Sequence, residues 1–203
     1  MIKKIHKWLK EPMFLNTYDI LKFVLITLIF ATISFLIVGC DKKIELTELP
    51  KFVDTKQVIT KEQVITKIKT RLPKTTVEAY DGKYKVLDHE FLEQAVKWNK
   101  WTNFRFGIDY EKEVFDCDDF AKVLVADIYR MAAASNVDID AGLTICVLSV
   151  RQVFPWAGIK AGGLHALIGV MTNKGIYIIE PQNGTMIEFE NYPNREHVYR
   201  IIF

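Results

Sequence analysis

The spacing of apolar residues changes at about residue 135 of the 203-residue chain. Before that point, apolar residues recur every three or four positions in several segments, which is typical of amphipathic helices. After it, short runs rich in β-branched residues alternate with turns that contain glycine and asparagine, which is typical of strands. Helices that come first and an antiparallel sheet that comes last indicate an α+β fold.

The sequence predicts three helices in the first part of the folded region. One begins after Thr60, because Thr60 and Gln63 form the pattern of a capping box, and it ends before Pro73. A second begins after Asp88, which is a suitable N-cap. The third and longest covers residues 117–134 and is expected to bury one stripe of apolar side chains: Phe120, Leu124, Ile128 and Met131.

Four strands are predicted after the longest helix, over residues 143–150, 165–171, 176–180 and 185–189. The turn sequences TNKG (172–175) and PQNG (181–184) join the last three strands into an antiparallel meander. Earlier in the chain, loosely alternating residues between 76 and 87 favour a hairpin around Asp81-Gly82. An aromatic stretch over residues 98–115 is expected to belong mainly to the core, because clustered aromatic side chains are usually buried.

The register of the meander follows from its first turn. If Asn173 and Lys174 form a two-residue turn, His165 lies opposite Gln182. Side chains two residues apart share a face of a strand, so Glu180 lies on the face of His165, one diagonal step away. A register shift of one residue would remove both candidate partners of His165 from that face.

An uncharged apolar run precedes the folded region, from residue 23 to Cys40, and lysines flank its N-terminal side. The run reaches the roughly 18 residues of a membrane span and exceeds the ~7–15 residues of an ordinary signal sequence core. It ends in IVGC (37–40), which resembles the lipobox of bacterial lipoproteins, whose cysteine is lipidated. A plain signal anchor with a chance cysteine is the alternative.

These features predict three regions. Residues 1–40 form a signal anchor or lipoprotein signal with a membrane segment at about 20–40, residues 41–58 form a tether, and residues 59–203 form the folded domain. Lysines on the N-terminal side favour a cytoplasmic N-terminus, unless the chain is cleaved and lipidated at Cys40. We therefore expect a membrane-anchored protein whose domain lies outside the cytoplasm, in the cell envelope.

Charge and cysteine content exclude several functions. Basic and acidic residues nearly balance and form no basic stripe, so nucleic acid is not an expected partner. Three cysteines without a CxxC motif indicate neither a disulfide scaffold nor a zinc site. Cys146 lies in the apolar strand LTICVLSV and is expected to be a buried structural residue.

Cys117 is different, because it lies among aspartates at the predicted start of the longest helix. The unpaired N–H groups and the dipole of a helix N-terminus stabilise a thiolate and can also bind an oxyanion. A thiol on a helix, followed by His165 and Glu180 on successive strands, provides the nucleophile, base and orienting acid of a thiol hydrolase. Gln182 is the second candidate for orienting the base.

Three carboxylates surround this cysteine, and they admit two interpretations. Asp116, Asp118 and Asp119 can favour the positive end of the helix, or they can bind a divalent cation. The pattern is not an EF-hand, because Phe120 occupies a ligand position and the required glycine is absent.

The motifs FDCDDFA (115–121), GGLHALIGV (162–170) and IYIIEPQNG (176–184) resemble the papain-like and transglutaminase-like cysteine peptidase superfamily. Within it, they are most similar to the C-terminal peptidase domain of fungal agglutinin-type lectins. This resemblance implies a papain-like fold with the nucleophile-bearing helix packed on an antiparallel sheet, a triad of Cys117, His165 and Glu180, and calcium dependence. It covers residues from about Thr60 to the C-terminus.

The chain departs from this family in two respects. The glutamine that papain places shortly before its cysteine is missing, since residues 111–115 read EKEVF, and Gln94, Asn99 and Asn103 are the candidate oxyanion donors. The lectin half of the agglutinins is also missing, so their glycan binding is not expected here.

Two function classes stay open on the sequence. The first is a membrane-tethered peptidase or amidase that acts on a peptide or a cell-wall amide, with transglutaminase-type transfer as a variant of the same chemistry. The second is a non-enzymatic envelope lipoprotein or membrane protein that uses the papain-like fold as a binding module. A Cys117–Cys146 disulfide in an oxidising compartment would favour the second class.

Overall fold

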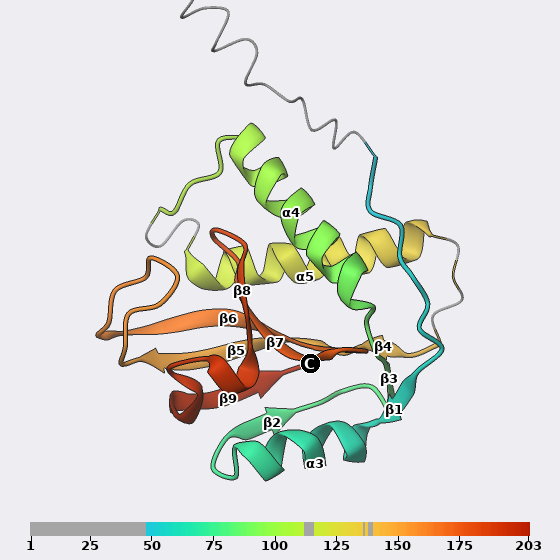
Figure 1. Ribbon diagram of the computed structural model, residues 1–203, viewed down its shortest axis with the longest axis horizontal. Coiled ribbons are helices and arrows are strands. Elements are labelled where there is room, and N and C mark those ends of the chain that lie inside the picture. Colours follow the sequence, from blue (N-terminus) through green and yellow to red (C-terminus); the bar gives the residue numbers. More distant parts are fainter. Residues whose placement is uncertain (1–47, 112–115, 136, 138–139) are drawn as a thin grey trace, which may run out of the picture. The chain divides into compact units, whose positions relative to one another are not determined.

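A six-stranded sheet forms the centre of the computed structural model, with the strand order β2-β9-β5-β6-β7-β8 (Figure 1). The strands are β2 (Thr76–Glu78), β9 (Val198–Ile202), β5 (Ile145–Gln152), β6 (Gly163–Thr172), β7 (Gly175–Glu180) and β8 (Thr185–Glu188). Every neighbouring pair is antiparallel except β2 and β9, which are parallel. The expected α+β class, with a sheet rich in antiparallel pairs, is therefore confirmed.

The structure describes residues 48–111, 116–135, 137 and 140–203, all of which belong to one compact unit from Leu46 to Phe203. Cys40, the apolar run before it and residues 41–47 of the expected tether lie outside the described residues. Within the described part of the chain, no helix is long and apolar enough to cross a membrane.

Helices cover both faces of the sheet (Figure 1). On one face, α4 (His89–Arg105) and α5 (Cys117–Ala134) enclose a core with alternate residues of the strands, among them Ile145, Ile168 and Ile179. On the other face, α3 (Lys61–Arg71) packs over Cys146, Leu167 and Ile178. This alternation is the two-residue period of a strand buried on both sides.

The helix predictions are confirmed. Helix α3 has the capping box of Thr60 and Gln63, and Asp88 caps α4 by accepting a hydrogen bond from the backbone N–H of Phe91. Helix α5 has the predicted bounds, and its expected apolar stripe is buried: Phe120, Leu124, Ile128 and Met131.

Three expectations for the early part of the domain are wrong. The hairpin between residues 76 and 87 does not form, because β2 joins the large sheet beside β9, whereas β3 (Lys83–Lys85) joins a small sheet with β1 (Val58–Thr60) and β4 (Gly142–Leu143). The domain also begins before residue 59, because Phe52 is buried and its ring contacts Phe91 at 5.2 Å between centroids. Three side chains of the aromatic stretch are exposed rather than buried: Phe104, Phe106 and Tyr110.

Three elements at the C-terminal end were not predicted. The short helical turns η1 (Phe189–Asn191) and η2 (Arg195–His197) follow β8, and they lead into β9. Strand β9 has a buried Val198 and Ile201 but exposed residues between them, and it lies between β2 and β5 in the sheet.

The register of β6 and β7 is the predicted one. Met171 pairs with Ile176 and Thr172 with Gly175, so Asn173 and Lys174 form the two-residue turn. Inside this turn, the hydroxyl of Thr172 accepts hydrogen bonds from the backbone N–H groups of Lys174 and Gly175 at 3.1 and 3.2 Å.

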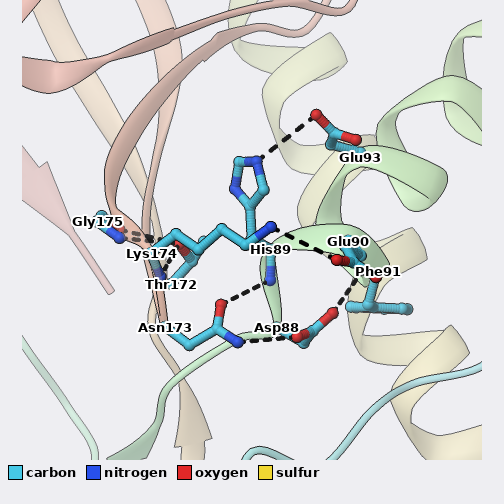
Figure 2. A network of polar contacts seen from close by, with 9 residues as sticks. All are labelled: Asp88, His89, Glu90, Phe91, Glu93, Thr172, Asn173, Lys174 and Gly175. Carbon is cyan, nitrogen blue, oxygen red and sulfur yellow. Dashed lines mark hydrogen bonds and ion pairs between the residues drawn. The ribbon is translucent and has the colours of Figure 1, made fainter.

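The same turn is bound to the N-terminus of α4 (Figure 2). The side-chain oxygen of Asn173 accepts a hydrogen bond from the backbone N–H of His89 at 3.0 Å, and its amide nitrogen donates to Asp88 at 2.9 Å. The second oxygen of Asp88 is the acceptor that caps α4, through the N–H of Phe91 at 2.9 Å. One aspartate therefore joins the helix cap to the hairpin turn.

We predict that Asp88→Ala lowers the free energy of unfolding by about 1–2 kcal/mol, because it removes the N-cap of α4 and the acceptor of Asn173. Urea unfolding followed by circular dichroism measures this change. Glu90→Gln is the matched control, because Glu90 is an exposed residue of the same helical turn and forms an ion pair with the exposed Lys174 at 3.5 Å. The control is expected to change the free energy by less than about 0.5 kcal/mol. Equal effects of the two substitutions would contradict the role of Asp88.

Candidate active site

His165 and Glu180 form a buried pair where β6 begins and β7 ends. The Nε2–H group of His165 donates a hydrogen bond to Oε2 of Glu180 at 2.6 Å. Glu180 is fully buried and His165 is only 7% exposed. The predicted diagonal relation between these two residues is therefore present in the structure.

The other carboxylate oxygen of Glu180 is also bound. Oε1 accepts a hydrogen bond from the backbone N–H of Gln182 at 3.1 Å, and the carbonyl of Glu180 accepts one from Gly184 at 2.8 Å. Gln182 thus contributes through its backbone, by holding Glu180, rather than through a side-chain bond to His165. Both oxygens of Glu180 are fixed, and this fixes the imidazole plane in turn.

Cys117 is the first residue of α5, and it lies beside the imidazole of His165. The residue before it, Asp116, is the N-cap, and Asp116 and Asp119 form a reciprocal capping box. Because Nε2 of His165 is bound to Glu180, the ring nitrogen available to the Cys117 thiol is Nδ1. The structure therefore brings both Cys117 and Glu180 to the imidazole of His165.

The environment of His165 favours its protonated form. Burial by itself lowers the pKa of this imidazole, but hydrogen bonds and charge interactions with Cys117 and Glu180 outweigh burial and raise the pKa from 6.5 to about 9. The imidazolium is thus stabilised by a sulfur on one side and a carboxylate on the other.

The three aspartates at the start of α5 also lie close together. One ligand atom from each of Asp116, Asp118 and Asp119 lies within 4.8 Å of the other two. The Nζ of Lys122 forms ion pairs with Asp118 and Asp119. A hydrogen bond with Asp118 raises the pKa of Asp116, whereas the bonds of Asp118 to Asp116 and Lys122 lower the pKa of Asp118.

The side chains proposed as oxyanion donors have other positions. Asn99 is buried and donates to Asp127 of α5 at 2.7 Å, and Asn103 donates to Asn99 at 3.2 Å. The Asn99 amide therefore joins α4 to α5, and Asn103 supports Asn99 from the next turn of α4, while Gln94 is exposed. Among the residues that the structure describes, the backbone N–H of Cys117 has no hydrogen-bond acceptor, which makes it an available donor beside the thiol.

Cys146 is a buried structural residue, as expected. Its thiol donates to the carbonyl of Gly169 at 3.2 Å, and burial raises its pKa to about 12. Cys117 and Cys146 are both free, and they pack in the cores on opposite faces of the sheet. The disulfide between them is therefore not present.

Sequence reasoning missed the residues that hold the loop before β6. The side-chain oxygen of Asn194, a fully buried residue, accepts hydrogen bonds from the N–H groups of Val153 and Phe154 at 2.9 and 2.7 Å. Trp156 of this loop packs edge-on against Tyr192 at 5.0 Å between ring centroids. The sequence around Asn194 reads Tyr192-Pro193-Asn194 and carries no recognisable signal of this anchoring role.

Comparisons with known proteins support the fold. The sequence matches no protein-family profile and no curated protein. A structure titled "PSL1a-E64 complex" is 20% identical, with a TM-score of 0.54 over 72% of this chain and 50% of that chain. A lectin of Polyporus squamosus, bound to a human-type influenza-binding epitope, is 18% identical, with a TM-score of 0.53 over 72% of this chain and 49% of that chain.

This likeness concerns the fold, because the identity is low, and the chain spans about half the length of either structure. The expected relation to a fungal agglutinin-type lectin is supported at that level. No match to a papain-like peptidase family accompanies it.

We predict that the His165 imidazole titrates near pH 9 in NMR spectra of the histidine side chains. The folded pKa is raised above the ordinary value of 6.5, so the stabilisation from this group is complete below pH 6.5 and is lost as the pH rises through about 9. Glu180→Gln removes the charge but keeps the shape, and it should lower the pKa of His165.

Glu188→Gln, an exposed carboxylate in the same hairpin, is the control and should leave the titration of His165 unchanged. A resonance of His165 that titrates near pH 6.5 in the unmodified protein would show that the imidazole is not held as described.

Proposed function

We propose that the domain is a thiol hydrolase, a peptidase or an amidase, with Cys117 as nucleophile, His165 as general base and acid, and Glu180 as the orienting residue. The observation that carries this proposal is the position of His165, with Glu180 on Nε2 at 2.6 Å and Cys117 on its other side. A structural histidine needs only its ion-pair partner. A thiol hydrolase also needs a thiol next to the imidazole, and the helix N-terminus provides a suitable place for it.

The groups present can complete the reaction without further side chains. His165 takes the proton of Cys117, and the sulfur attacks the carbonyl carbon of the scissile amide. The imidazolium then protonates the nitrogen as the C–N bond breaks, and a thioester with Cys117 remains. Water, deprotonated by His165, attacks the thioester and releases the acid and the thiol. An amine in place of water would give transglutaminase-type transfer.

The backbone N–H of Cys117 is the proposed oxyanion donor. It belongs to the first turn of α5, where N–H groups lack intrahelical acceptors, and it is adjacent to the attacking sulfur. A backbone N–H at this position would donate a hydrogen bond to the oxyanion, which is the role of the papain glutamine that is missing before Cys117.

The similar structures support the papain-like part of this proposal. One of them is titled as a complex with E64, which is an epoxide that alkylates thiols. In this chain, the cysteine-bearing helix α5 packs on a sheet whose strand pairs are mostly antiparallel. We therefore propose a papain-like fold and an E64-type reactivity for Cys117.

Calcium is the proposed cofactor, and the donor set fits it. Carboxylate oxygens are the ligands that calcium prefers, and Asp116, Asp118 and Asp119 can each offer one within 4.8 Å of the others. Binding would displace Lys122 from Asp118 and Asp119. The ion would supply positive charge close to Cys117, which favours its thiolate form.

The substrate and the location follow as proposals from the sequence. A peptide or a cell-wall amide suits the triad, and the apolar run before Cys40 suits attachment to the membrane with the domain in the cell envelope. Both alternatives for the N-terminus, an anchor or a lipidated Cys40, give this location.

We predict that E64 or iodoacetamide modifies Cys117 selectively near pH 6 and that Cys146 is not modified, because Cys146 is buried. Mass spectrometry of the digested protein identifies the labelled cysteine. Cys117→Ala should abolish labelling and the hydrolysis of an unfolded protein such as casein. His165→Gln should lower hydrolysis by roughly 10²–10⁴-fold, because general acid–base catalysis is lost.

Cys146→Ala is the matched control and should keep both labelling and hydrolysis. Glutamine is chosen at position 165 because it can still donate to the buried Glu180, whereas alanine would leave that carboxylate unpaired. Equally slow labelling of Cys117 and Cys146 in folded protein, with no hydrolysis at any calcium concentration, would favour the non-enzymatic binding module instead.

We also predict that the full chain is found in the membrane fraction of cells and that removal of residues 1–47 releases the domain from it. Cys40→Ser separates the two alternatives: it should abolish membrane attachment through a lipid but not attachment through an uncleaved anchor. Full-length protein in the soluble fraction would contradict both.

A further inference from the structure

A cavity of about 330 Å³ opens beside the candidate active site. Its walls come from four segments: residues 108–110, the first turn of α5, the loop before β6 and the turn between β7 and β8. Two wall residues connect it directly to the triad. Gln182 holds Glu180 through its backbone N–H, and Phe120 lies one turn after Cys117. The volume is at the lower end of the range of ligand sites in proteins.

The loop before β6 is shaped to form one wall. Ala157 and Gly158 both have positive φ angles, of 51° and 82°, a conformation that is uncommon for alanine. The side-chain amide of Asn183 donates to the carbonyl of Ala157 at 2.6 Å and holds this conformation. Strained backbone that is held by a neighbouring side chain is common at binding sites.

The walls combine an apolar lining with one charge. Most of the lining is apolar: Ile108, Tyr110, Phe120, Ala157 and Ile159. Of the described lining residues, only Asp109 is charged. It is exposed, and it forms no ion pair within the part of the chain that the structure describes. Among the described residues next to the lining segments, acidic residues outnumber basic ones: Glu111, Asp116, Asp118 and Asp119 against Lys122 and Lys160.

We propose that this cavity is a substrate subsite that binds the side chain of a lysine or arginine near the scissile bond. The aliphatic stem of such a side chain would lie on the apolar walls, and its cationic end would reach Asp109. This inference rests on the proposed hydrolase function for the position of the scissile bond. The binding of the side chain itself needs only the cavity and Asp109.

Binding to the Cys117→Ala variant of the full chain, in detergent, tests the subsite without turnover. The ligands are alanine-based hexapeptides with lysine at one position, each paired with a peptide that has norleucine there. Norleucine has the same aliphatic stem but no charge. Isothermal titration in the presence of EDTA keeps cations away from the aspartates of α5. We expect at least one lysine peptide to bind roughly two- to fivefold more tightly than its norleucine partner.

Asp109→Asn should remove this preference by weakening the binding of the lysine peptide. Asp140→Asn removes one carboxylate elsewhere, since Asp140 is exposed and pairs with Lys83, and it should keep the preference. Thermal unfolding shows whether both variants are folded. Norleucine peptides that bind as well as lysine peptides, a preference that survives Asp109→Asn, or no binding of any peptide would each overturn the proposal.

The labelling of Cys117 is measured in a separate experiment, so the two proposals can fail independently. Loss of labelling with retained lysine preference would reject the hydrolase but not the subsite. Normal labelling without a lysine preference would reject the subsite alone.

Discussion

The two-residue turn at Asn173 and Lys174 fixes the pairing of β6 with β7, and the candidate site depends on that pairing. His165 and Glu180 lie toward the open end of this hairpin. A change in the turn that shifts the register therefore also changes the face of the sheet on which one of these side chains lies. A shift by one residue would move one side chain of the pair to the opposite core. The bond of Asn173 to the cap of α4 opposes such a shift, because the helix and the turn would both lose hydrogen bonds.

Burial of Glu180 imposes a second requirement on the same hairpin. A carboxylate with no exposed surface is unfavourable unless both oxygens have donors. The backbone N–H of Gln182 supplies one donor locally, within the turn that follows β7. The imidazole of His165 supplies the other, and the charge of Glu180 in turn favours the imidazolium. The pair is therefore stable as a unit.

Local signals explain which parts of the fold could be predicted. The capping residues Thr60 and Asp88, the apolar stripe of α5 and the turn sequence TNKG each act over a few residues, and each prediction from them was confirmed. The errors concern pairings that no local pattern specifies. Strand β2 pairs with β9, which is more than a hundred residues away in the sequence. Because β2 is short and polar, its position depends on the sheet that it joins rather than on its own composition.

The same limit applied to the site. Counting residues along a hairpin placed Glu180 next to His165, because both lie on strands joined by one turn. Counting could not assign Asn99 and Asn103, since the Asn99 amide is bound to Asp127 of α5, Asn103 donates to Asn99, and only the packing of α4 on α5 reveals the first of these bonds. The roles of Asn183 and Asn194 were missed for a related reason. Each binds backbone groups of the loop before β6, and that loop has no fixed shape in a sequence pattern.

The two cysteines lie on opposite faces of the sheet, in different environments. Cys146 lies on a central strand, where Gly169 leaves room for its sulfur and accepts its S–H group; a Cβ at Gly169 would approach that sulfur to 3.0 Å. Cys117 lies at the end of a helix on the opposite face, beside a charged imidazole and a backbone N–H without an acceptor in the described chain. Burial in an apolar layer raises the pKa of Cys146 and disfavours its thiolate. The sheet that divides the two cores therefore separates the buried Cys146 from Cys117, which lies at a helix N-terminus next to His165.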